Sequence, residues 1–288
     1  MFFNKAQRKK AKLRLGITGP AGSGKTFGAL LVAFGLGGKI ALIDTENGSG
    51  DLYSTLGDYD IGYITAPYTV EKYLQAIHEA ENAGYDIIII DSLSHAWSGE
   101  GGLLDQQSRI TATSKSGNSY AAWRQITPMH NKLIDTMLSS PALIIATMRS
   151  KTEYVQTENE RGYKEIRKVG LAPVQREGMD YEFGVVFDLG VNHLASVSKD
   201  RTGIFDEQIF KLSQDTGKIL RKWLDEGVDI EQRNRLYKNY LEKFGGDKDK
   251  AQTFMLSITD GRGSKEWTQD DIQKLEAGLL DEAVGSEQ

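Results

Sequence analysis

A glycine-rich stretch near the N-terminus has the residue types and spacing of a phosphate-binding loop. The pattern G-x-x-x-x-G-K-[ST] is matched at every position by Gly19, Pro20, Ala21, Gly22, Ser23, Gly24, Lys25 and Thr26. Glycines let successive backbone N–H groups surround phosphate oxygens, and the positive end of a following helix lies at the same place. Lys25 would contact the β- and γ-phosphates, and the Thr26 hydroxyl would bind Mg²⁺. The segment therefore predicts binding of ATP with Mg²⁺; the alternative is a glycine-rich turn with an incidental Lys-Thr pair.

Asp91 is the candidate for a second magnesium ligand beside Thr26. It follows the apolar run Ile87–Ile90. An ionised carboxylate at the end of a buried strand is unfavourable unless a metal or hydrogen-bond donors lie nearby. The alternative is an Asp that only caps the strand.

Glu46 is the candidate for the group that activates water. It lies just past the apolar segment Lys39–Asp44, where a carboxylate could hold an attacking water molecule. From the pattern alone, an exposed loop glutamate is the commoner interpretation.

The apolar segments alternate between strand-like runs and helical spacing, which predicts an α/β fold with a mostly parallel central sheet. The expected strands are Leu13–Thr18, Lys39–Asp44, Ile61–Thr65, Asp86–Ile90 and Ala142–Thr147, and antiparallel strands are expected at Glu182–Leu189, Leu194–Lys199 and Gln208–Leu212. The expected helices are Thr26–Leu36, Val70–Asn82 and one that starts at Thr127-Pro128 and ends at Ser139. Long loops are expected at Trp97–Ser119 and Ser150–Asp180.

The last sixty residues differ in character from the rest. Ile230, Tyr237, Leu241 and Phe244 share one helical face, and Thr268 with Asp271 resembles a capping box. We therefore expect a domain over residues 1–226 and a small helical module over residues 227–288.

Composition limits the class of protein. The chain has 288 residues, a net charge of −5 and no cysteine, which excludes disulfides and thiolate metal sites. Its longest apolar run is far too short for a transmembrane helix, and the N-terminus lacks the features of a secretory signal, so a cytoplasmic protein that contacts no membrane is expected. The net charge argues against nucleic acid, but Lys5–Arg14 and Arg149–Arg176 are locally basic.

Four segments, GPAGSGKT, ALIDTE, IIIIDS and SKDRTG, occur in the order typical of RecA-like P-loop ATPases, which the chain resembles. The resemblance implies a RecA-like P-loop NTPase core in which Glu46 is the catalytic base. It also implies that Tyr53 packs on adenine, and Phe27, which follows Thr26, is a further candidate for nucleotide binding. Thr147 stands where the family has a polar sensor of the γ-phosphate, often Gln. Lys199 and Arg201 stand where RecA-like proteins have a pair of cations that is inserted into a neighbouring subunit's ATP site. If these two cations complete a neighbour's ATP site, the protein acts as a homo-oligomer, either a filament or a ring.

Two further strings, DSLSHAW at Asp91–Trp97 and LAPVQREGMDYEF at Leu171–Phe183, resemble the phage-encoded Sak-type ATPases of recombination and single-strand annealing. The likeness covers roughly Lys12 to Lys222. It implies a DNA-binding ATP hydrolase in the host cytoplasm, with single-stranded DNA and a phage single-strand-binding protein as partners.

Two loops bind single strands in RecA-like proteins, and Trp97–Ser119 and Ser150–Asp180 stand at their places. The second contains the candidate DNA-binding residues Lys151, Arg161, Tyr163, Lys164, Arg167, Lys168 and Arg176. Cations can neutralise phosphates and an aromatic ring can stack on a base, although interleaved glutamates also suit a solvated loop of mixed charge. His95 and Trp97 are interpreted as packing at a strand end.

The alternative functions are a RecA-like motor or helicase-loading factor, a P-loop kinase of small molecules, and a nucleotide switch that does not hydrolyse. The sequence contains no segment that resembles the Arg-rich lid of a small-molecule kinase. The presence of both Lys25 and Glu46 argues against a nucleotide switch that does not hydrolyse.

Overall fold

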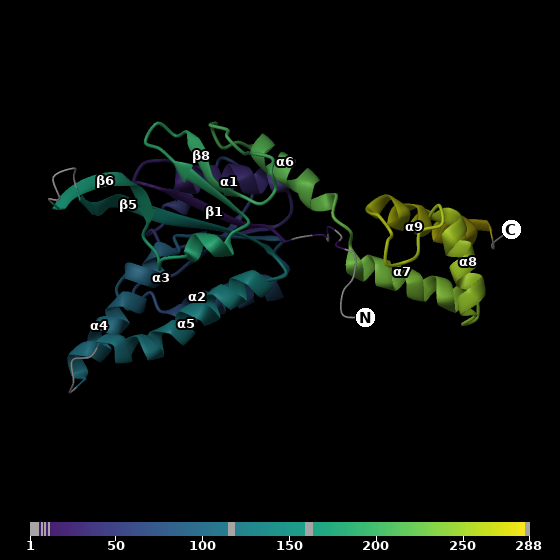
Figure 1. Ribbon diagram of the computed structural model, residues 1–288, viewed down its shortest axis with the longest axis horizontal. Coiled ribbons are helices and arrows are strands. Elements are labelled where there is room, and N and C mark those ends of the chain that lie inside the picture. The colour runs from purple at the N-terminus through teal and green to yellow at the C-terminus, as the bar shows by residue number, and fades with distance from the viewer. Residues whose placement is uncertain are drawn as a thin grey trace. The chain divides into compact units, whose positions relative to one another are not determined.

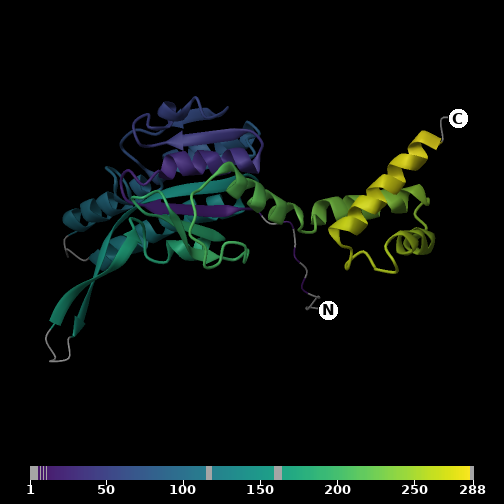
Figure 2. The same ribbon diagram turned by 90° about the horizontal axis from the view of Figure 1, so that it is seen from above.

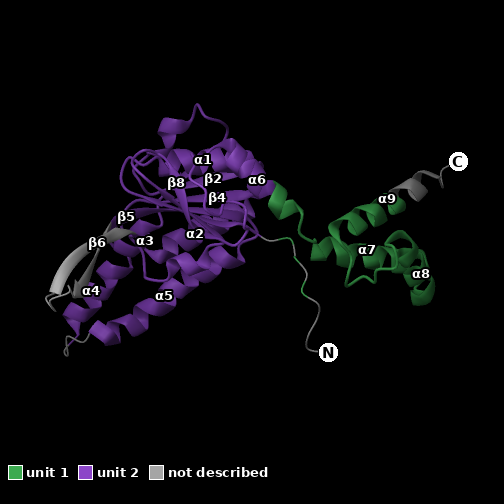
Figure 3. Cartoon of the chain, turned by 45° about the horizontal axis from the view of Figure 1, so that its top comes forward, with its two compact units in different colours: residues 1–11, 222–288 green, residues 12–221 purple. Residues whose placement is uncertain are grey.

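The computed structural model describes residues 12–114, 119–158 and 164–285 together with Ala6, Arg8 and Lys10. The chain divides into two compact units, residues 12–221 and residues 1–11 with 222–288 (Figure 3). The expected boundary was residue 226, whereas the observed division falls inside helix α6 (Gln214–Asp225). Arg8 and Lys10 group with the C-terminal helices, because Lys10 donates its backbone N–H to Val228 at 2.8 Å.

The larger unit is built on a mixed sheet in the order β3-β2-β4-β5-β1-β7-β8, with β6 paired to β5. Its strands are β1 (Arg14–Gly19), β2 (Ile40–Asp44), β3 (Asp60–Tyr63), β4 (Ile87–Asp91), β5 (Leu143–Glu158), β6 (Lys164–Pro173), β7 (Val185–Leu189) and β8 (Ala195–Asp200). The pairs from β3 to β7 along this order are parallel, and only β7–β8 and β5–β6 are antiparallel. The predicted α/β fold, with its antiparallel strands at one edge, is confirmed.

Helices cover both faces of this sheet (Figure 1), which explains why β4 is apolar on both sides. Helices α2 (Val70–Asn82) and α5 (Ser119–Ser139) pack on one face with α3 (Ser94–Ser98), while α1 (Lys25–Leu36) and α6 lie on the other. Helix α4 (Leu103–Thr113) precedes α5, and short 3₁₀ turns are η1 (Gly50–Tyr53) and η2 (Met179–Glu182).

Strand register brings the ends of β1, β2, β4 and the middle of β5 to one edge of the sheet. Asp44 is level with Asp91, and Gly19 is level with Arg149. Ligands of open α/β sheets bind at such a carboxyl edge. Side chains that follow these strands are therefore placed together although they are far apart in sequence.

The first expected loop, Trp97–Ser119, is wrong in its central part, because α4 occupies most of it. The expected helix start at Thr127-Pro128 is also wrong, since α5 begins at Ser119 and Pro128 lies inside it. The buried face of α5 continues through this point from Ala122 to Met137. Burial of that face offsets the hydrogen bond that the proline removes.

The second expected loop, Ser150–Asp180, is wrong as well. Strand β5 continues to Glu158 and pairs with β6 in a two-stranded ribbon that projects from the rest of the unit (Figures 1 and 2). Polar segments such as these form strands by pairing backbones with each other, a pattern that apolar periodicity does not reveal. The strand expected at Gln208–Leu212 is reduced to a single bridge between Phe210 and Ala195.

The smaller unit contains helices α7 (Ile230–Lys243), α8 (Lys248–Ile258) and α9 (Gln269–Gly285) around its own apolar core. The expected capping box is present, because Thr268 Oγ1 accepts from the Asp271 N–H at 3.2 Å and Asp271 Oδ2 accepts from the Thr268 N–H at 2.8 Å. No helix in the described part of the chain combines the length and the hydropathy needed to cross a membrane.

Candidate functional site

The glycine-rich loop joins β1 to α1 in a tight turn over the sheet edge. Gly22 and Gly24 have φ values of 75° and 87°, a conformation that side chains other than glycine rarely adopt. A Cβ on Gly19 would lie 2.4 Å from Ser23 Oγ and 2.9 Å from the Leu189 carbonyl oxygen. The sequence therefore needs glycine at these positions for the backbone to fold closely enough to surround an anion.

Lys25 is the first residue of α1, and its ammonium group bends back to donate to the Pro20 carbonyl at 2.9 Å. Burial lowers the pKa of Lys25, and the nearby Asp91 and Glu46 partly oppose that effect. A desolvated ammonium inside a glycine-rich turn gains a stronger partner when a phosphate oxygen takes the place of the carbonyl.

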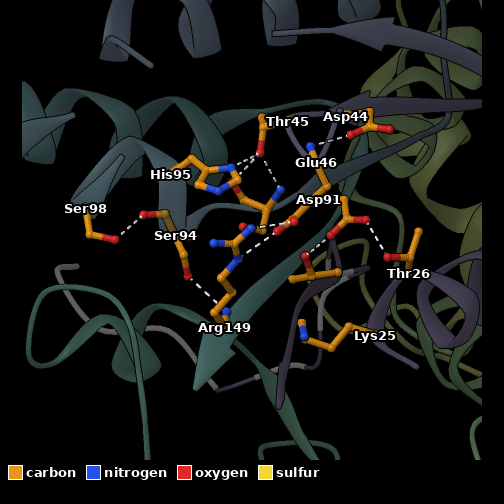
Figure 4. A network of polar contacts seen from close by, with 12 residues as sticks. Lys25, Thr26, Asp44, Thr45, Glu46, Asp91, Ser94, His95, Ser98 and Arg149 are labelled. Atoms are coloured by element: carbon orange, nitrogen blue, oxygen red, sulfur yellow. Dashed lines mark hydrogen bonds and ion pairs between the residues drawn. The ribbon is translucent and has the colours of Figure 1, made fainter. Parts of the chain in front are cut away.

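Asp91 is almost fully buried at the end of β4 and accepts hydrogen bonds from two threonines (Figure 4). Thr26 Oγ1 donates to Asp91 Oδ2 at 2.6 Å, and Thr147 Oγ1 donates to Asp91 Oδ1. Burial raises the pKa of Asp91, and the two hydroxyl donors oppose this only in part. A carboxylate whose charge is disfavoured in this way is stabilised by a divalent cation.

The donor set at this point suits Mg²⁺. A carboxylate and a hydroxyl are hard oxygen ligands, and Mg²⁺ in phosphate-transfer sites takes one or two protein groups together with phosphates and water. Among the described residues no cluster of three or more His, Asp or Glu side chains forms a self-sufficient metal site. Thr26 and Asp91 are thus the two described groups placed to share such an ion with a bound phosphate.

Glu46 lies at the same edge and forms an ion pair that sequence reasoning missed (Figure 4). Arg149 Nε donates to Glu46 Oε1 at 2.9 Å, and Arg149 Nη2 donates to Glu46 Oε2 at 2.5 Å. Burial would raise the pKa of Glu46, but the hydrogen bonds and charge of Arg149 outweigh it, so the pKa is lowered. Glu46 is therefore an ionised carboxylate with both oxygens held by one guanidinium.

The spacing of Thr147 and Arg149 in the sequence is a signal that could have placed Arg149 at the site. Thr147 and Arg149 are two residues apart on β5, and alternate side chains of a strand point to the same face. Since Thr147 contacts Asp91, Arg149 had to lie on the nucleotide side of the sheet. Its partner Glu46 is 103 residues away in sequence, so only the order of the strands brings them together.

His95 does more than pack at the strand end. Its ring stacks on Tyr68 with centroids 4.7 Å apart, as the packing interpretation expects, and its Nδ1 also lies 2.6 Å from Thr45 Oγ1. Thr45 Oγ1 in turn accepts from the Ser92 N–H at 2.8 Å. Burial and the charge of Arg149 lower the pKa of His95, so a neutral imidazole links α3 to the residue that precedes Glu46.

Phe27 and Tyr53 meet beside the loop, with ring centroids 5.7 Å apart and an edge-to-face angle of 66°. Phe27 remains 40% exposed. The two rings form an apolar surface next to the first turn of α1, of the kind on which a purine can pack. The resemblance had assigned this role to Tyr53, and the contact with Phe27 adds a second ring.

Lys199 and Arg201 do not join this site within the chain. Lys199 is paired with Val186, which is level with Gly16 on β1, whereas the glycine-rich loop begins at Gly19. Lys199 Nζ donates to the carbonyls of Asp180 at 2.9 Å and Tyr181 at 2.7 Å, and Arg201 Nη2 donates to Tyr181 at 3.2 Å. The antiparallel direction of β8 thus carries both cations away from this chain's own loop.

The candidate DNA-binding residues fall into two groups. Lys151, Lys164, Arg167 and Lys168 belong to the β5–β6 ribbon, while Arg161 and Tyr163 lie outside the described residues. Arg176 comes after β6 and lies elsewhere, with its guanidinium 5.9 Å from the centroid of the Trp123 ring. The structure therefore separates Arg176 from the ribbon with which it was grouped.

Comparison with known proteins bears on the segment that carries this geometry. Residues 11–208 match the family model described as an AAA domain. A similar solved structure is an ATPase from the type III secretion system of pathogenic bacteria, with 13% identity over 93% of this chain and 81% of that chain. Its TM-score is 0.37, too low to bear on function. No curated protein matches the chain. Since the matched segment spans more than half of the sequence and contains the loop, Asp91 and Glu46, the chain belongs to the AAA domain family of P-loop nucleotide-binding proteins.

Proposed function

We propose that the protein hydrolyses ATP with Mg²⁺ and that it acts on single-stranded DNA in phage recombination or single-strand annealing. The observation that carries the first half is the meeting of Lys25, Thr26, Asp91 and Glu46 at one sheet edge. These four groups supply the phosphate cation, the two magnesium ligands and the general base of a phosphoryl transfer to water.

In this proposal the backbone N–H groups of the loop and the Lys25 ammonium hold the β- and γ-phosphates. Thr26 and Asp91 would hold Mg²⁺, which would neutralise charge that develops on the phosphates. Glu46 orients a water molecule and accepts its proton as the oxygen attacks the γ-phosphorus. The bond to the β–γ bridging oxygen breaks, and ADP leaves.

Thr147 and Arg149 act next to this chemistry. Thr147 donates to one oxygen of Asp91 and Thr26 to the other, so the two hydroxyls hold the carboxylate in place beside Thr26. Arg149 keeps Glu46 ionised, but its bidentate contact also occupies both acceptor oxygens. Turnover in this mechanism requires Arg149 to release at least one oxygen of Glu46. A bound γ-phosphate favours this release, because it gives the Arg149 guanidinium another anionic partner.

The proposed oligomer rests on Lys199 and Arg201. Both lie away from this chain's own loop, so they could serve only a neighbouring subunit's nucleotide, and they would first leave the carbonyls of Asp180 and Tyr181. A cation supplied in trans at the γ-phosphate stabilises the charge of the transition state. Isolated monomers should then hydrolyse ATP slowly.

The proposed action on DNA is supported by the resemblance to Sak-type ATPases and by the cations of the β5–β6 ribbon. The test measures phosphate release from ATP with and without single-stranded oligonucleotides, and oligonucleotide binding at low salt. Stimulation by single strands supports the proposal. Hydrolysis that is not stimulated, together with no binding at low salt, would remove its DNA half and leave an ATPase with another task.

A further inference from the structure

An open groove lies between α3, α5 and the segment that follows β6, away from the glycine-rich loop. It has a volume of about 1030 Å³. Aromatic and cationic side chains dominate its lining, chiefly Trp97, Tyr120, Trp123, Arg124, Arg176 and Tyr181. The proposed mechanism of ATP hydrolysis uses no residue of this lining.

The aromatic rings of the groove are arranged as a stacking surface. Trp97 and Trp123 are stacked with centroids 5.8 Å apart and an angle of 24° between their planes. Tyr120 and Tyr181 stand at the rim with 77% and 70% of their surface exposed. Large exposed rings gathered around one groove usually mark a binding site. Planar bases are suited to such rings, because stacking on aromatic side chains tolerates any base.

The charges of the groove suit a phosphate backbone. Arg124 and Arg176 contribute two guanidinium groups, and among the described lining residues Glu177 is the one acidic side chain. Arg176 is held over Trp123 at 5.9 Å, so its cation lies beside the stacked rings. Lys199 Nζ also lies 5.5 Å from the centroid of the Tyr181 ring. Rings next to cations are the pattern of single-strand binding sites, in which bases stack and phosphates pair.

A buried histidine adds an independent indication of a ligand. His130 is 7% exposed, and its Nε2 has no hydrogen-bond partner among the described residues. It lines an adjoining cavity of about 540 Å³ that shares Thr127, Arg176, Glu177 and Gly178 with the groove. Its ring also meets Trp97 edge to face at 5.9 Å. A buried polar nitrogen without a partner is unfavourable, and the edge of a base entering from the groove would satisfy it.

We propose that this groove binds single-stranded DNA, with bases stacked on Trp123, Tyr120 and Tyr181 and phosphates on Arg124 and Arg176. The inference rests on the proposed function and names the site that the resemblance had placed on the two segments Trp97–Ser119 and Ser150–Asp180. The β5–β6 ribbon then contributes charge rather than base stacking.

The groove is also connected to the nucleotide site by short contacts. Gln175, next to Arg176, donates its side-chain amide to the Leu93 carbonyl at 3.2 Å, and Val174 donates its N–H to the Arg149 carbonyl at 2.6 Å. Trp97 shares α3 with His95, which contacts Thr45 beside Glu46. Neighbouring residues thus link the groove to both members of the Glu46–Arg149 pair.

The test measures binding of fluorescent oligo(dT) by anisotropy at low salt for Tyr181→Ala and Tyr120→Ala. We expect each to bind roughly 5- to 150-fold more weakly, the range for losing one stacked base, with an unchanged slope of log affinity against log salt. Tyr181→Phe keeps the ring and should bind like the wild type. Tyr63→Ala is the matched control, because Tyr63 is 55% exposed on the edge strand β3 and does not line the groove. Arg124→Gln should instead reduce the salt slope by about 1.

The outcomes separate the inference from the proposed function. Wild-type protein that fails to bind oligonucleotides at low salt refutes both the groove and the DNA half of the function. A second outcome is that the wild type and both tyrosine variants bind oligonucleotides equally well, and only the ribbon variant Lys151→Ala/Lys168→Ala loses affinity. That outcome refutes the groove as the binding site but leaves the proposed DNA binding in place. Weaker binding of Tyr181→Ala with rescue by Tyr181→Phe supports the groove.

Discussion

Replacing Glu46 by glutamine should separate nucleotide binding from hydrolysis. The amide has nearly the same shape as the carboxylate but cannot accept a proton from water. Loss of a general base reduces turnover by at least ~10²-fold, which corresponds to about 2.7 kcal/mol of barrier. Since Glu46 contacts neither the glycine-rich loop nor the Phe27–Tyr53 pair in any described hydrogen bond or ring contact, ATP affinity should change little.

The structure also limits how far this substitution can destabilise the fold. The Glu46 and Arg149 side chains are 24% and 47% exposed, and an ion pair so open to solvent contributes roughly 0.2–1 kcal/mol. A domain of this size would lose at most a few degrees in Tm, on the order of 2–4 °C. A hundredfold loss of activity could not come from unfolding of that extent.

The assay is phosphate release at saturating ATP, with affinity measured separately by calorimetry and Tm by thermal melting. Glu71→Gln is the matched control, because Glu71 is an exposed glutamate in the first turn of α2. An unchanged rate of phosphate release by Glu46→Gln would refute the assignment of the base. An equal loss in the Glu71 control would show that the assay reports charge or stability instead.

The other predictions address the neighbouring groups and the packing. Arg149→Gln removes the contact that lowers the pKa of Glu46. Because the Glu46 carboxylate then becomes protonated at a higher pH, the acid limb of the pH profile of kcat/KM should move to higher pH than in the wild type. An acid limb that does not move contradicts the pairing of Arg149 with Glu46. Lys25→Ala should abolish ATP binding in calorimetry, whereas Lys238→Ala on the exposed face of α7 should bind ATP normally. Equal heats of ATP binding from both variants would refute the assignment of the glycine-rich loop as the ATP site. Removing Mg²⁺ with a chelator should stop turnover reversibly, since Asp91 then keeps only its two threonine donors, and turnover that persists would argue against a metal at Asp91. Gly35→Ala should lower stability by about 1–3 kcal/mol in chemical denaturation, because its Cβ would lie 1.8 Å from the Gln214 carbonyl oxygen, while Gly62→Ala, with nothing within 4 Å, should be nearly neutral.

The central elements could be predicted because their signals are local. The apolar run Ile87–Ile90 predicted a strand buried on both faces, and the glycines and lysine of the loop predicted a turn and a helix start. In each case the residues that determine the structure are contiguous, so a window of a few residues contains the physical cause. The same holds for the capping box at Thr268.

The peripheral elements were predicted poorly for a related reason. Helix α4 has a single fully buried residue, Leu103, so its apolar periodicity is weak and the segment resembled a loop. The β5–β6 ribbon forms by mutual pairing of two polar segments, and neither segment alone indicates that the other is its partner. Pro128 suggested a helix start because only the packing of α5 on the sheet shows that the helix extends to both sides of it.

The sequence by itself identified the phosphate loop and the acid that ends β4, because a contiguous motif and an apolar run mark their places. Glu46 became the candidate base only through the resemblance of the segment ALIDTE to RecA-like ATPases. Only the tertiary structure decided that Arg149 pairs with Glu46, that Lys199 and Arg201 point away from this chain's own loop, and that Arg176 joins an aromatic groove. Those contacts depend on strand order and register, which bring together residues as many as 103 positions apart. No local pattern of residue types specifies such a neighbour, since the same side chains would meet other partners if the strands were ordered differently.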